Sequence, residues 1–431
     1  MAEPMRVGVA GLGTVGAAAV RMIERQAAAL EARCGRPVLV TAISSRARGK
    51  DRGFDASRMA WFDDPVALAA SPDIDVFVEL IGGSEGPARA AVTAALDAGK
   101  PVVTANKALL AAHGMEIARR AEENGAALAF EAAVAGGIPV IKALRESLAG
   151  NKVRRVSGIL NGTCNYILSK MEQEKLPFDA CLKEAQRLGY AEADPTFDIG
   201  GFDAAHKLSI LASLAFGTAI DAEAIHIEGI ESITLADLLA ADDLGFRVKL
   251  LGVAQRTHNG VEARVHPTMV AKTTPIAQGM GVTNAVAIDA DPLGALTLVG
   301  PGAGGDATAS SVVSDIADLA RGARCAPLGL PSGKLAEAER IPMQRHEGGY
   351  YIRLDVADKP GAMAAIATRM AERGISLESI VQKAAHGSGQ RVPVVLITHA
   401  TSESLVREAL DLVVADGFVS GRPQLIRIER A

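Results

Sequence analysis

The sequence is poor in aromatic residues and cysteine and has no excess of basic charge. Only 3% of its 431 residues are aromatic, so its cores must be built from alanine, valine, leucine and isoleucine. The four cysteines, Cys34, Cys164, Cys181 and Cys325, are scattered and form no C-x-x-C pair, which argues against a zinc knuckle or a dithiol motif. Reduced thiols are the simplest interpretation. A formal net charge of −5 gives no reason to expect nucleic acid or an anionic membrane as a partner.

Long hydrophobic runs are also missing. No stretch approaches the roughly 18 uninterrupted apolar residues that a membrane-spanning helix requires. The opening MAEPMRVGVAGLG enters a strand pattern without a basic region or a long hydrophobic region, so we expect no secretory signal and a cytoplasmic protein. With 49% hydrophobic and 22% charged residues, the composition is typical of a soluble globular protein. The length predicts two to four domains, at about 150 residues each.

The first 130 residues alternate short apolar segments with segments of helical character. The apolar segments are 5–10, 38–43, 74–81, 101–105 and 126–130. Helices are expected up to about residue 32 and near 86–98 and 108–124. This alternation predicts βαβ units and an α/β fold with a Rossmann-type, doubly wound parallel sheet.

The pattern changes near residue 137, which predicts further domains. We expect a nucleotide-binding domain over 1–136, completed by about 300–325, and an α+β substrate-binding and dimerisation domain over 137–299. Residues 326–349, rich in proline and glycine, predict a linker. Residues 350–431 have a compact βαββα-like pattern that predicts a separate, ferredoxin-like domain.

The segment GVAGLGTVG carries the first chemical signal. Gly11, Gly13 and Gly16 have G-x-G-x-x-G spacing between a predicted strand and a predicted helix, which is the context of a dinucleotide site. The helix N-terminus there offers free N–H groups to phosphates. The predicted cofactor loop also includes Leu12, Thr14 and Val15. The alternative is a glycine turn without a ligand.

The end of the second strand bears on the choice of cofactor. NAD enzymes usually carry an acidic residue there for the ribose 2′-hydroxyl. This chain has serines followed by Arg46, Arg48 and Lys50, which suit a 2′-phosphate and favour NADP over NAD. A solvated basic loop is the alternative.

The segment 189–217 combines acidic residues with an apolar helix. Asp203 and Lys207 are four residues apart and share a helix face, which Lys207 also shares with apolar residues. A lysine on that side is unusual unless it is paired or used. An ammonium held by a carboxylate could protonate the alkoxide formed in an aldehyde reduction. A surface ion pair of little energetic weight is the competing interpretation.

A second lysine, Lys107, follows the strand PVVTANK, which also contains Thr104. Ligands bind beyond the carboxyl ends of parallel strands, so both residues are candidates for the cofactor site and Lys107 for catalysis. The alternative for Lys107 is a solvated lysine at a helix start.

The segments GLGTVG, ANK, NGTCNYIL and GYAEADPTFDIGGFDAAHK follow one another as in homoserine dehydrogenases, and the chain resembles that family over roughly residues 5–320. The resemblance implies NAD(P)H-dependent reduction of L-aspartate 4-semialdehyde to L-homoserine, on the path to threonine and methionine. It implies that Lys207 donates and accepts the proton, that Asp203 holds it, and that Lys107 lies beside substrate and nicotinamide. It places Glu192, Asp198 and Thr163 at the substrate, with Glu192 at its amino group. Cys164 departs from the family's NGTTNYIL motif, and we expect a change in packing there rather than lost activity.

Two further segments acquire meaning from the resemblance. EAAVAGGIP resembles the family's monovalent cation site, which implies that a sodium ion binds at Glu131, Val134, Gly136 and Ile138. GPGAGGDAT resembles the return of the chain to the cofactor domain, with Gly305 near the nicotinamide. Without the resemblance, both are ordinary turns.

Residues 350–431 resemble an ACT domain, with Asp358-Lys359-Pro360-Gly361 as the loop that opens its first helix. Such domains usually bind amino acids, which implies feedback inhibition by L-threonine at a site formed where two tails pair. A homodimer or homotetramer follows from the same resemblance. A dimerisation module without a ligand is the alternative.

Two other functions compete with this interpretation. One is a different Rossmann reductase that acts on another small amino-acid-derived aldehyde. The other is a non-catalytic sensor of nucleotides and amino acids. The segment 189–207 argues against the first, and the presence of Lys207, Asp203 and Glu192 argues against the second.

Overall fold

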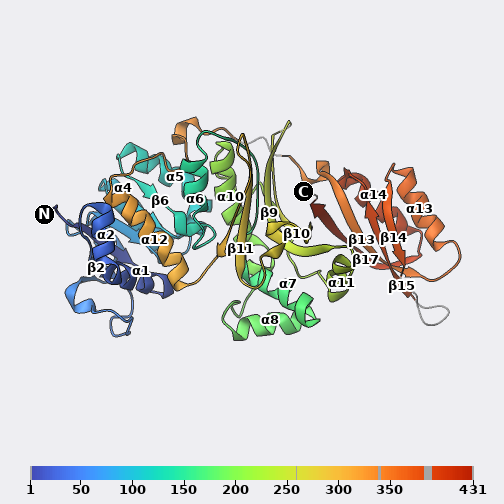
Figure 1. Ribbon diagram of the computed structural model, residues 1–431, viewed down its shortest axis with the longest axis horizontal. Coiled ribbons are helices and arrows are strands. Elements are labelled where there is room, and N and C mark those ends of the chain that lie inside the picture. Colours follow the sequence, from blue (N-terminus) through green and yellow to red (C-terminus); the bar gives the residue numbers. More distant parts are fainter. Residues whose placement is uncertain (1, 259, 338–340, 383–390, 430–431) are drawn as a thin grey trace.

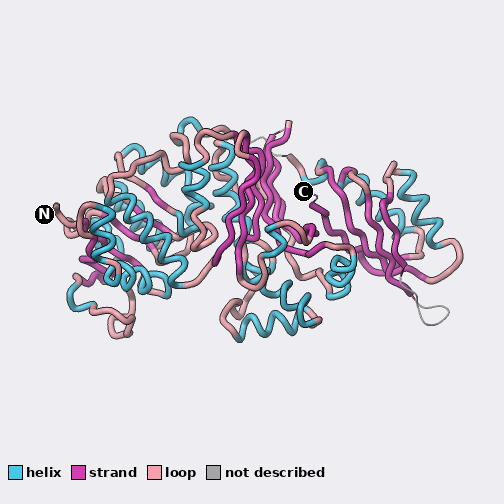
Figure 2. Tube along the Cα trace, in the orientation of Figure 1, coloured by secondary structure: helices cyan, strands magenta, loops and turns pink. Residues whose placement is uncertain are grey.

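The computed structural model describes residues 2–258, 260–337, 341–382 and 391–429. Three domains follow one another along the long axis of the molecule, with the N-terminus at one end (Figure 1). The first domain mixes helices and strands in layers, the middle is dominated by long strands, and the last has helices on one side of a sheet (Figure 2). Among the described residues, none of the helices combines the length and the apolar character needed to cross a bilayer.

The N-terminal sheet is entirely parallel, with the strand order β3-β2-β1-β4-β5-β6. Its strands are β1 (Met5–Ala10), β2 (Val38–Ser44), β3 (Ala60–Phe62), β4 (Val76–Glu79), β5 (Val102–Thr104) and β6 (Leu128–Ala129). The helices are α1 (Thr14–Arg25), α2 (Ala27–Cys34), α3 (Pro65–Ala70), α4 (Pro87–Asp97) and α5 (Lys107–Glu123). This order confirms the predicted Rossmann-type fold. Strand β3, which is only three residues long and includes the single tryptophan, Trp61, was not predicted.

Helix α12 (Gly305–Ala320) returns from the middle domain and lies against α1 (Figure 1). Its buried face includes Ala309, Val312 and Ile316, which join the core beneath α1 and β1. The return places the glycine-rich turn before α12 next to the glycine-rich loop after β1. This contact brings two segments almost 300 residues apart to the same edge of the parallel sheet.

The middle domain has a largely antiparallel sheet with the order β12-β11-β7-β9-β10. Its strands are β7 (Lys152–Ile159), β8 (His226–Ile227), β9 (Phe246–Thr257), β10 (Gly260–Ala271), β11 (Thr283–Asp291) and β12 (Gly294–Pro301). Its helices are α6 (Val140–Lys142), α7 (Gly162–Glu174), α8 (Phe178–Arg187), α9 (Thr196–Ile199), α10 (Phe202–Phe216) and α11 (Leu235–Asp243). Helix α6 is only one turn long and is followed by a π-helical turn, Ala143–Ser147.

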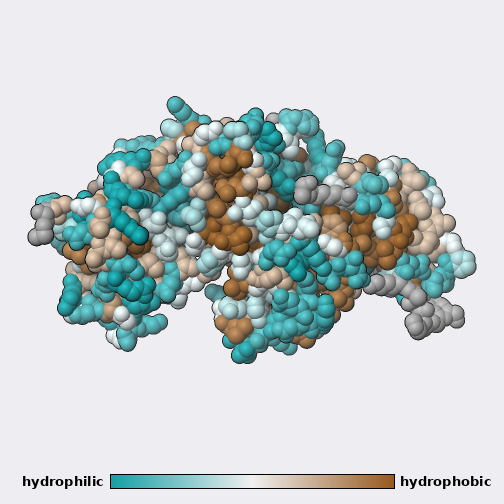
Figure 3. Space-filling model, in the orientation of Figure 1, coloured by the Kyte–Doolittle hydropathy of each residue, from teal (hydrophilic) through white to brown (hydrophobic). Residues whose placement is uncertain are grey.

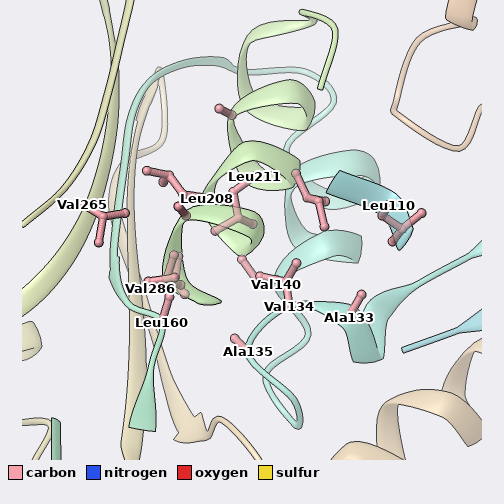
Figure 4. Packing of buried hydrophobic residues seen from close by; sticks show 14 of the residues in the cluster. Leu110, Ala133, Val134, Ala135, Val140, Leu160, Leu208, Leu211, Val265 and Val286 are labelled. Atoms are coloured by element: carbon pink, nitrogen blue, oxygen red, sulfur yellow. The ribbon is translucent and has the colours of Figure 1, made fainter. Parts of the chain in front are cut away.

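Helix α10 lies between this sheet and the N-terminal domain. Leu208 and Leu211 are fully buried, with Leu160, Val265 and Val286 on the sheet side and Val134 and Val140 opposite (Figure 4). Burial of each leucine contributes about 1.5–3 kcal/mol. The helix is therefore fixed on two sides, and its first turn lies where the two domains meet.

The C-terminal domain consists of β13 (Glu347–Ala357), α13 (Ala362–Glu372), β14 (Leu377–Gln382), β15 (Arg391–Thr398), β16 (Thr401–Ser402), α14 (Glu403–Ala415) and β17 (Val419–Glu429). Its main sheet has the order β17-β13-β15-β14. Strand β17 also pairs in parallel with β10 through three residues, which joins the two sheets. Hydrophobic residues gather over the middle of the molecule and over these last strands on the face shown in Figure 3. Ile380 and Val381 of β14 are among the exposed apolar side chains.

Buried charges accompany that junction. Arg264 of β10 and Arg427 of β17 are 1% and 2% exposed. Arg427 pairs with Glu228 and Glu403 at 2.6 Å, and Arg264 pairs with Glu262 and Glu429 at 2.8 Å. We call these six residues the junction cluster. Each arginine thus has two carboxylates, one of them from the other domain.

Candidate active site

The glycine-rich loop forms one wall of a cavity of about 720 Å³. Gly11 has a φ of 95° and passes so close to the carbonyl of Leu80 that a Cβ would collide with it. A Cβ on Gly16 would collide with the carbonyl of Gly11, so α1 approaches β1 only because this position is glycine. Gly13 precedes the first turn of α1, where free N–H groups face the cavity end of the helix. This geometry suits a pyrophosphate.

The basic residues after β2 have different positions. Arg46 and Lys50 line the cavity, together with Ser44 and Ser45. Arg48, which the sequence also suggested for the 2′-phosphate, forms an exposed ion pair with Asp63 at 2.8 Å and is not among the lining residues. The structure therefore separates two arginines that the sequence treated alike.

Arg52, which sequence reasoning missed, holds this loop together. It is 8% exposed and donates hydrogen bonds to the Leu12 carbonyl at 3.2 Å, the Lys50 carbonyl at 2.8 Å and the Ser45 hydroxyl at 3.0 Å. It also donates to the Ala47 carbonyl. One guanidinium thus ties the glycine-rich loop to the segment that carries Arg46. In the sequence, Arg52 looks like the other basic residues of this loop, and only its hydrogen-bond partners in the structure distinguish it.

Glu79 is a second residue that sequence reasoning missed. It is fully buried at the end of β4, and its carboxylate accepts hydrogen bonds from the N–H groups of Ile81 and Gly82 and from the Thr104 hydroxyl. Thr104 in turn accepts from the Asn106 N–H. The available signal was an acid at the end of the otherwise apolar strand VFVE. Glu79 fixes the ends of β4 and β5, where Thr104 was expected to meet the cofactor.

Gly305 lies where the second glycine-rich turn meets the first. A Cβ on it would approach the Thr14 side chain to 3.1 Å. The first residue of α12 therefore faces the first residue of α1. The turn therefore lies beside the cofactor loop. The more specific prediction, that Gly305 lies near the nicotinamide, stays a prediction.

The two candidate lysines converge on one carboxylate. Lys207 Nζ lies 2.7 Å from Asp203 Oδ2 and 2.8 Å from the Leu160 carbonyl. Lys107 Nζ, from the start of α5 in the other domain, lies 3.1 Å from Asp203 Oδ1. Asp203 is 4% exposed. Burial alone would raise the pKa of Asp203, but Lys207 and Lys107 outweigh it and hold that pKa well below its ordinary value. The carboxylate therefore stays charged and holds both ammonium groups.

Asn161, also missed, completes the cluster. Its Nδ2 donates to Asp203 at 2.9 Å and to Asp198 at 2.8 Å, and its Oδ1 caps α7 by accepting from the Cys164 N–H. An Asn at the start of a helix predicts an N-cap. Its two carboxylate partners lie 37 and 42 residues away, so the sequence did not indicate them. Burial raises the pKa of Asp198, which the hydrogen bond from Asn161 opposes.

The remaining substrate candidates are placed differently. Thr163 is buried, and its hydroxyl donates to the Tyr190 carbonyl at 2.6 Å. Cys164 is buried, and its Sγ donates to the Asp198 carbonyl at 3.2 Å, so the cysteine packs beneath the site. Glu192 is exposed, and within the described part of the chain its carboxylate forms no hydrogen bond or ion pair. The structure does not bring it into the Asp203 cluster.

The expected cation loop is buried between the domains. The Glu131 carboxylate accepts from the N–H groups of Ile141 and Lys142, each at 2.8 Å. Burial raises the pKa of Glu131 to about 7. The Gly136 carbonyl accepts from Ser311, and the Ile138 carbonyl accepts from the Val140 N–H. Each of these carbonyls keeps a second lone pair, so their donor chemistry fits a hard monovalent cation.

Comparison with known proteins identifies three matching segments. Residues 139–317 match a sequence model described as homoserine dehydrogenase, residues 11–131 match the homoserine dehydrogenase NAD-binding domain, and residues 350–411 match the ACT domain. A homoserine dehydrogenase from Pseudomonas aeruginosa is 45% identical, with 99% of each chain covered. One from Neisseria gonorrhoeae is 42% identical with the same coverage.

Solved structures show the same likeness. A homoserine dehydrogenase from Thiobacillus denitrificans is 43% identical and superposes with a TM-score of 0.93, covering 99% of this chain and 98% of that one. A hyperthermophilic archaeal homoserine dehydrogenase in complex with NADPH is 29% identical, with a TM-score of 0.62, and covers 73% of this chain and 97% of that one.

Proposed function

The chain belongs to the homoserine dehydrogenase family and is an oxidoreductase, and we propose that it reduces L-aspartate 4-semialdehyde to L-homoserine and catalyses the reverse oxidation. One observation carries the proposal within the site. Asp203 is a buried, ionised carboxylate that holds an ammonium from each of two domains. A cofactor on the first domain and a substrate on the second would meet at this point.

The proton transfer follows from the geometry. The nicotinamide cofactor, when bound, supplies the hydride to the aldehyde carbon in the reduction. The carbonyl π electrons then become a lone pair on oxygen, and Lys207 donates a proton to that alkoxide. In the oxidation, neutral Lys207 accepts the hydroxyl proton. Asp203 and the Leu160 carbonyl fix the direction of the Lys207 Nζ, while Lys107 places a second positive charge near the developing oxyanion.

The substrate's polar end needs partners of its own. We assign Asp198 to the substrate ammonium because it lies in the cluster through Asn161 and is only partly buried. Thr163 shapes the same turn through Tyr190. Glu192 belongs to the exposed segment beside this turn, and its contribution requires the segment to move toward bound substrate. Replacement of Glu192 with Gln would then raise the Michaelis constant for homoserine without changing that for the cofactor.

Substrate competition tests the proposed reaction. The full chain should oxidise L-homoserine with NADP or NAD. L-Serine and 4-aminobutanol should be poor substrates, because L-serine is one methylene shorter and 4-aminobutanol lacks the carboxylate and carries its amine one carbon farther from the hydroxyl. Equal rates with 4-aminobutanol would indicate a general aldehyde reductase. No reduction of either cofactor by homoserine would favour the non-catalytic sensor.

NADP is the favoured cofactor. Arg46 and Lys50 line the cavity near the serines that end β2, where the ribose 2′ position is expected. Arg52 holds their backbone in place. These cations support a 2′-phosphate partner, and Arg48 contributes less because Asp63 neutralises it.

A monovalent cation, sodium in particular, is a further proposal. The carbonyls of Val134, Gly136 and Ile138 would hold it, with Glu131 contributing negative charge nearby. Replacement of sodium by choline at equal ionic strength should then lower both the activity and the thermal midpoint. Equal values in the two salts would contradict the proposal.

The C-terminal domain supports two proposals. L-Threonine acts as a feedback inhibitor through it, because the segment matches an amino-acid-binding type of domain and is joined to the substrate domain through β17 and β10. The chain also forms a homodimer or homotetramer, to which the exposed apolar residues of β14 contribute. Inhibition assays and light scattering test these separately. The protein acts in the cytoplasm on this proposal.

A further inference from the structure

A cavity of about 740 Å³ lies between the C-terminal domain and the substrate domain. The substrate domain lines it with Glu228, Gly229, Glu231, Ser232 and Pro267. The C-terminal domain lines it with α14, with Arg353 and with the start of β17. This size is in the range of small-molecule sites. The residues of the cofactor loop and of the Asp203 cluster do not line it, so the cavity is a separate site.

The charged side chains of this cavity differ in whether they are already paired. Arg353 is held by Asp237 at 2.6 Å. Arg407 bridges Glu403 at 2.6 Å and Glu228 at 3.2 Å. Arg422, Asp411 and Glu231 also line the cavity, and in the described ranges no hydrogen bond or ion pair engages their side chains. The cavity thus presents unpaired groups of both signs.

The segment around Gly229, which lines the cavity, packs against the end of α9, next to the Asp203 cluster. The Ile230 N–H donates to the Ile199 carbonyl at 2.9 Å. A Cβ on Gly229 would collide with that same carbonyl, so the two backbones are in direct contact. Ile199 follows Asp198 and ends α9, and Asp203 lies in the first turn of the next helix. A displacement of Glu228 and Gly229 would therefore reach both carboxylates of the active site.

We propose that this cavity is an effector site for a small α-amino acid. Arg422 and Arg407 would bind its carboxylate, and Asp411 or Glu231 would bind its ammonium. A zwitterion fits because the lining carries three arginines and three carboxylates, and so offers partners to both of its charges. A phosphate dianion would be repelled by the three carboxylates. The inference rests on the proposed regulation by an amino acid and gives that regulation a location.

The bound amino acid acts on catalysis by competing for Arg407. Its carboxylate draws Arg407 away from Glu228, and Glu228 then shifts relative to Arg427 and takes Gly229 and Ile230 with it. Inhibition follows when this shifted state binds the amino acid better than the active state does. The loop 358–361 does not line the cavity, so this site differs from the one expected where two tails pair.

Calorimetric titration of the full chain distinguishes the two locations. L-Threonine, L-isoleucine and L-methionine are the probes, and the variants are Arg422→Gln, Asp358→Asn and Arg391→Gln. Arg391 is the matched control because it is an exposed arginine of the same domain outside the cavity. We expect at least one probe to bind, and its Kd to rise roughly ten- to a hundredfold in Arg422→Gln, as for a lost charge-assisted hydrogen bond. The other two variants should bind within about twofold of the unaltered chain.

Three outcomes overturn the proposal. They are binding of none of the three probes, binding that is unchanged in Arg422→Gln, and binding that is lost in Asp358→Asn alone, which would locate the effector at the loop. Titration without substrate reports on effector binding and not on catalysis, whereas failure of homoserine oxidation by the unaltered chain would contradict the proposed function instead. Hydrogen exchange then tests the coupling, because the bound probe should change the exchange rate of the Ile230 amide. An unchanged rate would contradict the route through Ile199.

Discussion

Two buried groups of charges, the active-site cluster around Asp203 and the junction cluster around Arg427, have opposite designs. In the active site, one carboxylate faces two lysines, and the Lys107 side chain is 37% exposed. In the junction cluster, Arg427 lies between two carboxylates, and both it and Glu403 are 2% exposed. The first has positive charge to spare and an open side, which suits a developing oxyanion. The second has more carboxylates than arginines around a buried guanidinium, which suits a contact that joins the two domains.

The largest expected effect is on the open cluster. Replacement of Lys207 with Ala should lower turnover by about 10² to 10⁴, the usual scale for a positioned acid–base group, while cofactor binding stays near normal. Lys107→Met should cost less, because its ammonium supplies charge rather than the proton. Initial rates of homoserine oxidation and cofactor titrations check both. A Lys207→Ala enzyme with nearly full turnover would remove the lysine from the chemistry.

The junction cluster should respond in stability. Arg427→Met removes the buried guanidinium from Glu228 and Glu403 and leaves only the more exposed Arg407 between them, and we expect a loss of about 3–5 kcal/mol in the free energy of unfolding. Urea unfolding measures it. Arg48→Ser, which breaks an exposed pair with Asp63, is the control and should change stability by about 1 kcal/mol or less. Similar losses in the two variants would mean that the junction cluster does not join the domains.

Lys249 extends the comparison because it is a buried lysine that forms no ion pair with any carboxylate of the described residues. Its Nζ bonds the Asn165 side chain at 2.8 Å and the Gly279 carbonyl at 2.7 Å, and burial lowers its pKa to about 7. Between this value and the ordinary 10.5, the unfolded chain binds more protons than the folded chain, so a rise in pH stabilises the fold by at most about 1.4 kcal/mol per unit. Below about pH 7, both forms are protonated and this gain is absent.

The measurement is the unfolding free energy of the unaltered chain and of Lys249→Met at several pH values from 7 to 10. The free energy of unfolding of the unaltered chain relative to that of Lys249→Met should rise with pH over this window. A difference independent of pH would show that Lys249 keeps an ordinary pKa in the folded protein.

The two clusters also differ in what the sequence could predict. Asp203 and Lys207 are four residues apart on one helix, so the sequence spacing predicted their pairing. The Rossmann sheet was predicted from the alternation of short apolar segments with helical ones. Asn161 joins Asp198 and Asp203 only after β7 and α10 pack together. Arg427 and Glu228 are 199 residues apart, and no local period records such a contact. Arg52 was missed for the same reason, because its role depends on the four groups to which it donates hydrogen bonds in the folded chain and not on its position in the sequence.

The same pairing of strands bears on removal of the tail. Strand β17 pairs with β10, and Glu429 pairs with the buried Arg264. Deletion of residues 350–431 would expose that arginine and an edge of the sheet, so loss of regulation in a truncated chain would be confounded by instability. Single substitutions at the cavity are the better test.

The smallest expected effect is on cofactor choice. Arg46→Ser should raise the Michaelis constant for NADP by about tenfold or less and leave that for NAD nearly unchanged, because Arg46 lines the cavity and is exposed. Arg48→Ser should have little effect on either cofactor, since Asp63 holds Arg48 away. Steady-state kinetics with both cofactors compares the two variants. Equal effects of the two substitutions would contradict the separation that the structure shows.

The most direct test of the Asp203 cluster is kcat for homoserine oxidation in the unaltered chain, Asp203→Asn, Lys207→Ala and the double variant. If Asp203 acts chiefly by holding Lys207, the double variant should be slower than Lys207→Ala by much less than the factor that Asp203→Asn alone costs, because only Lys107 is left for the carboxylate to hold. Losses that multiply, with the double variant slower by the product of the two single effects, would show that Asp203 and Lys207 act independently and would contradict the account.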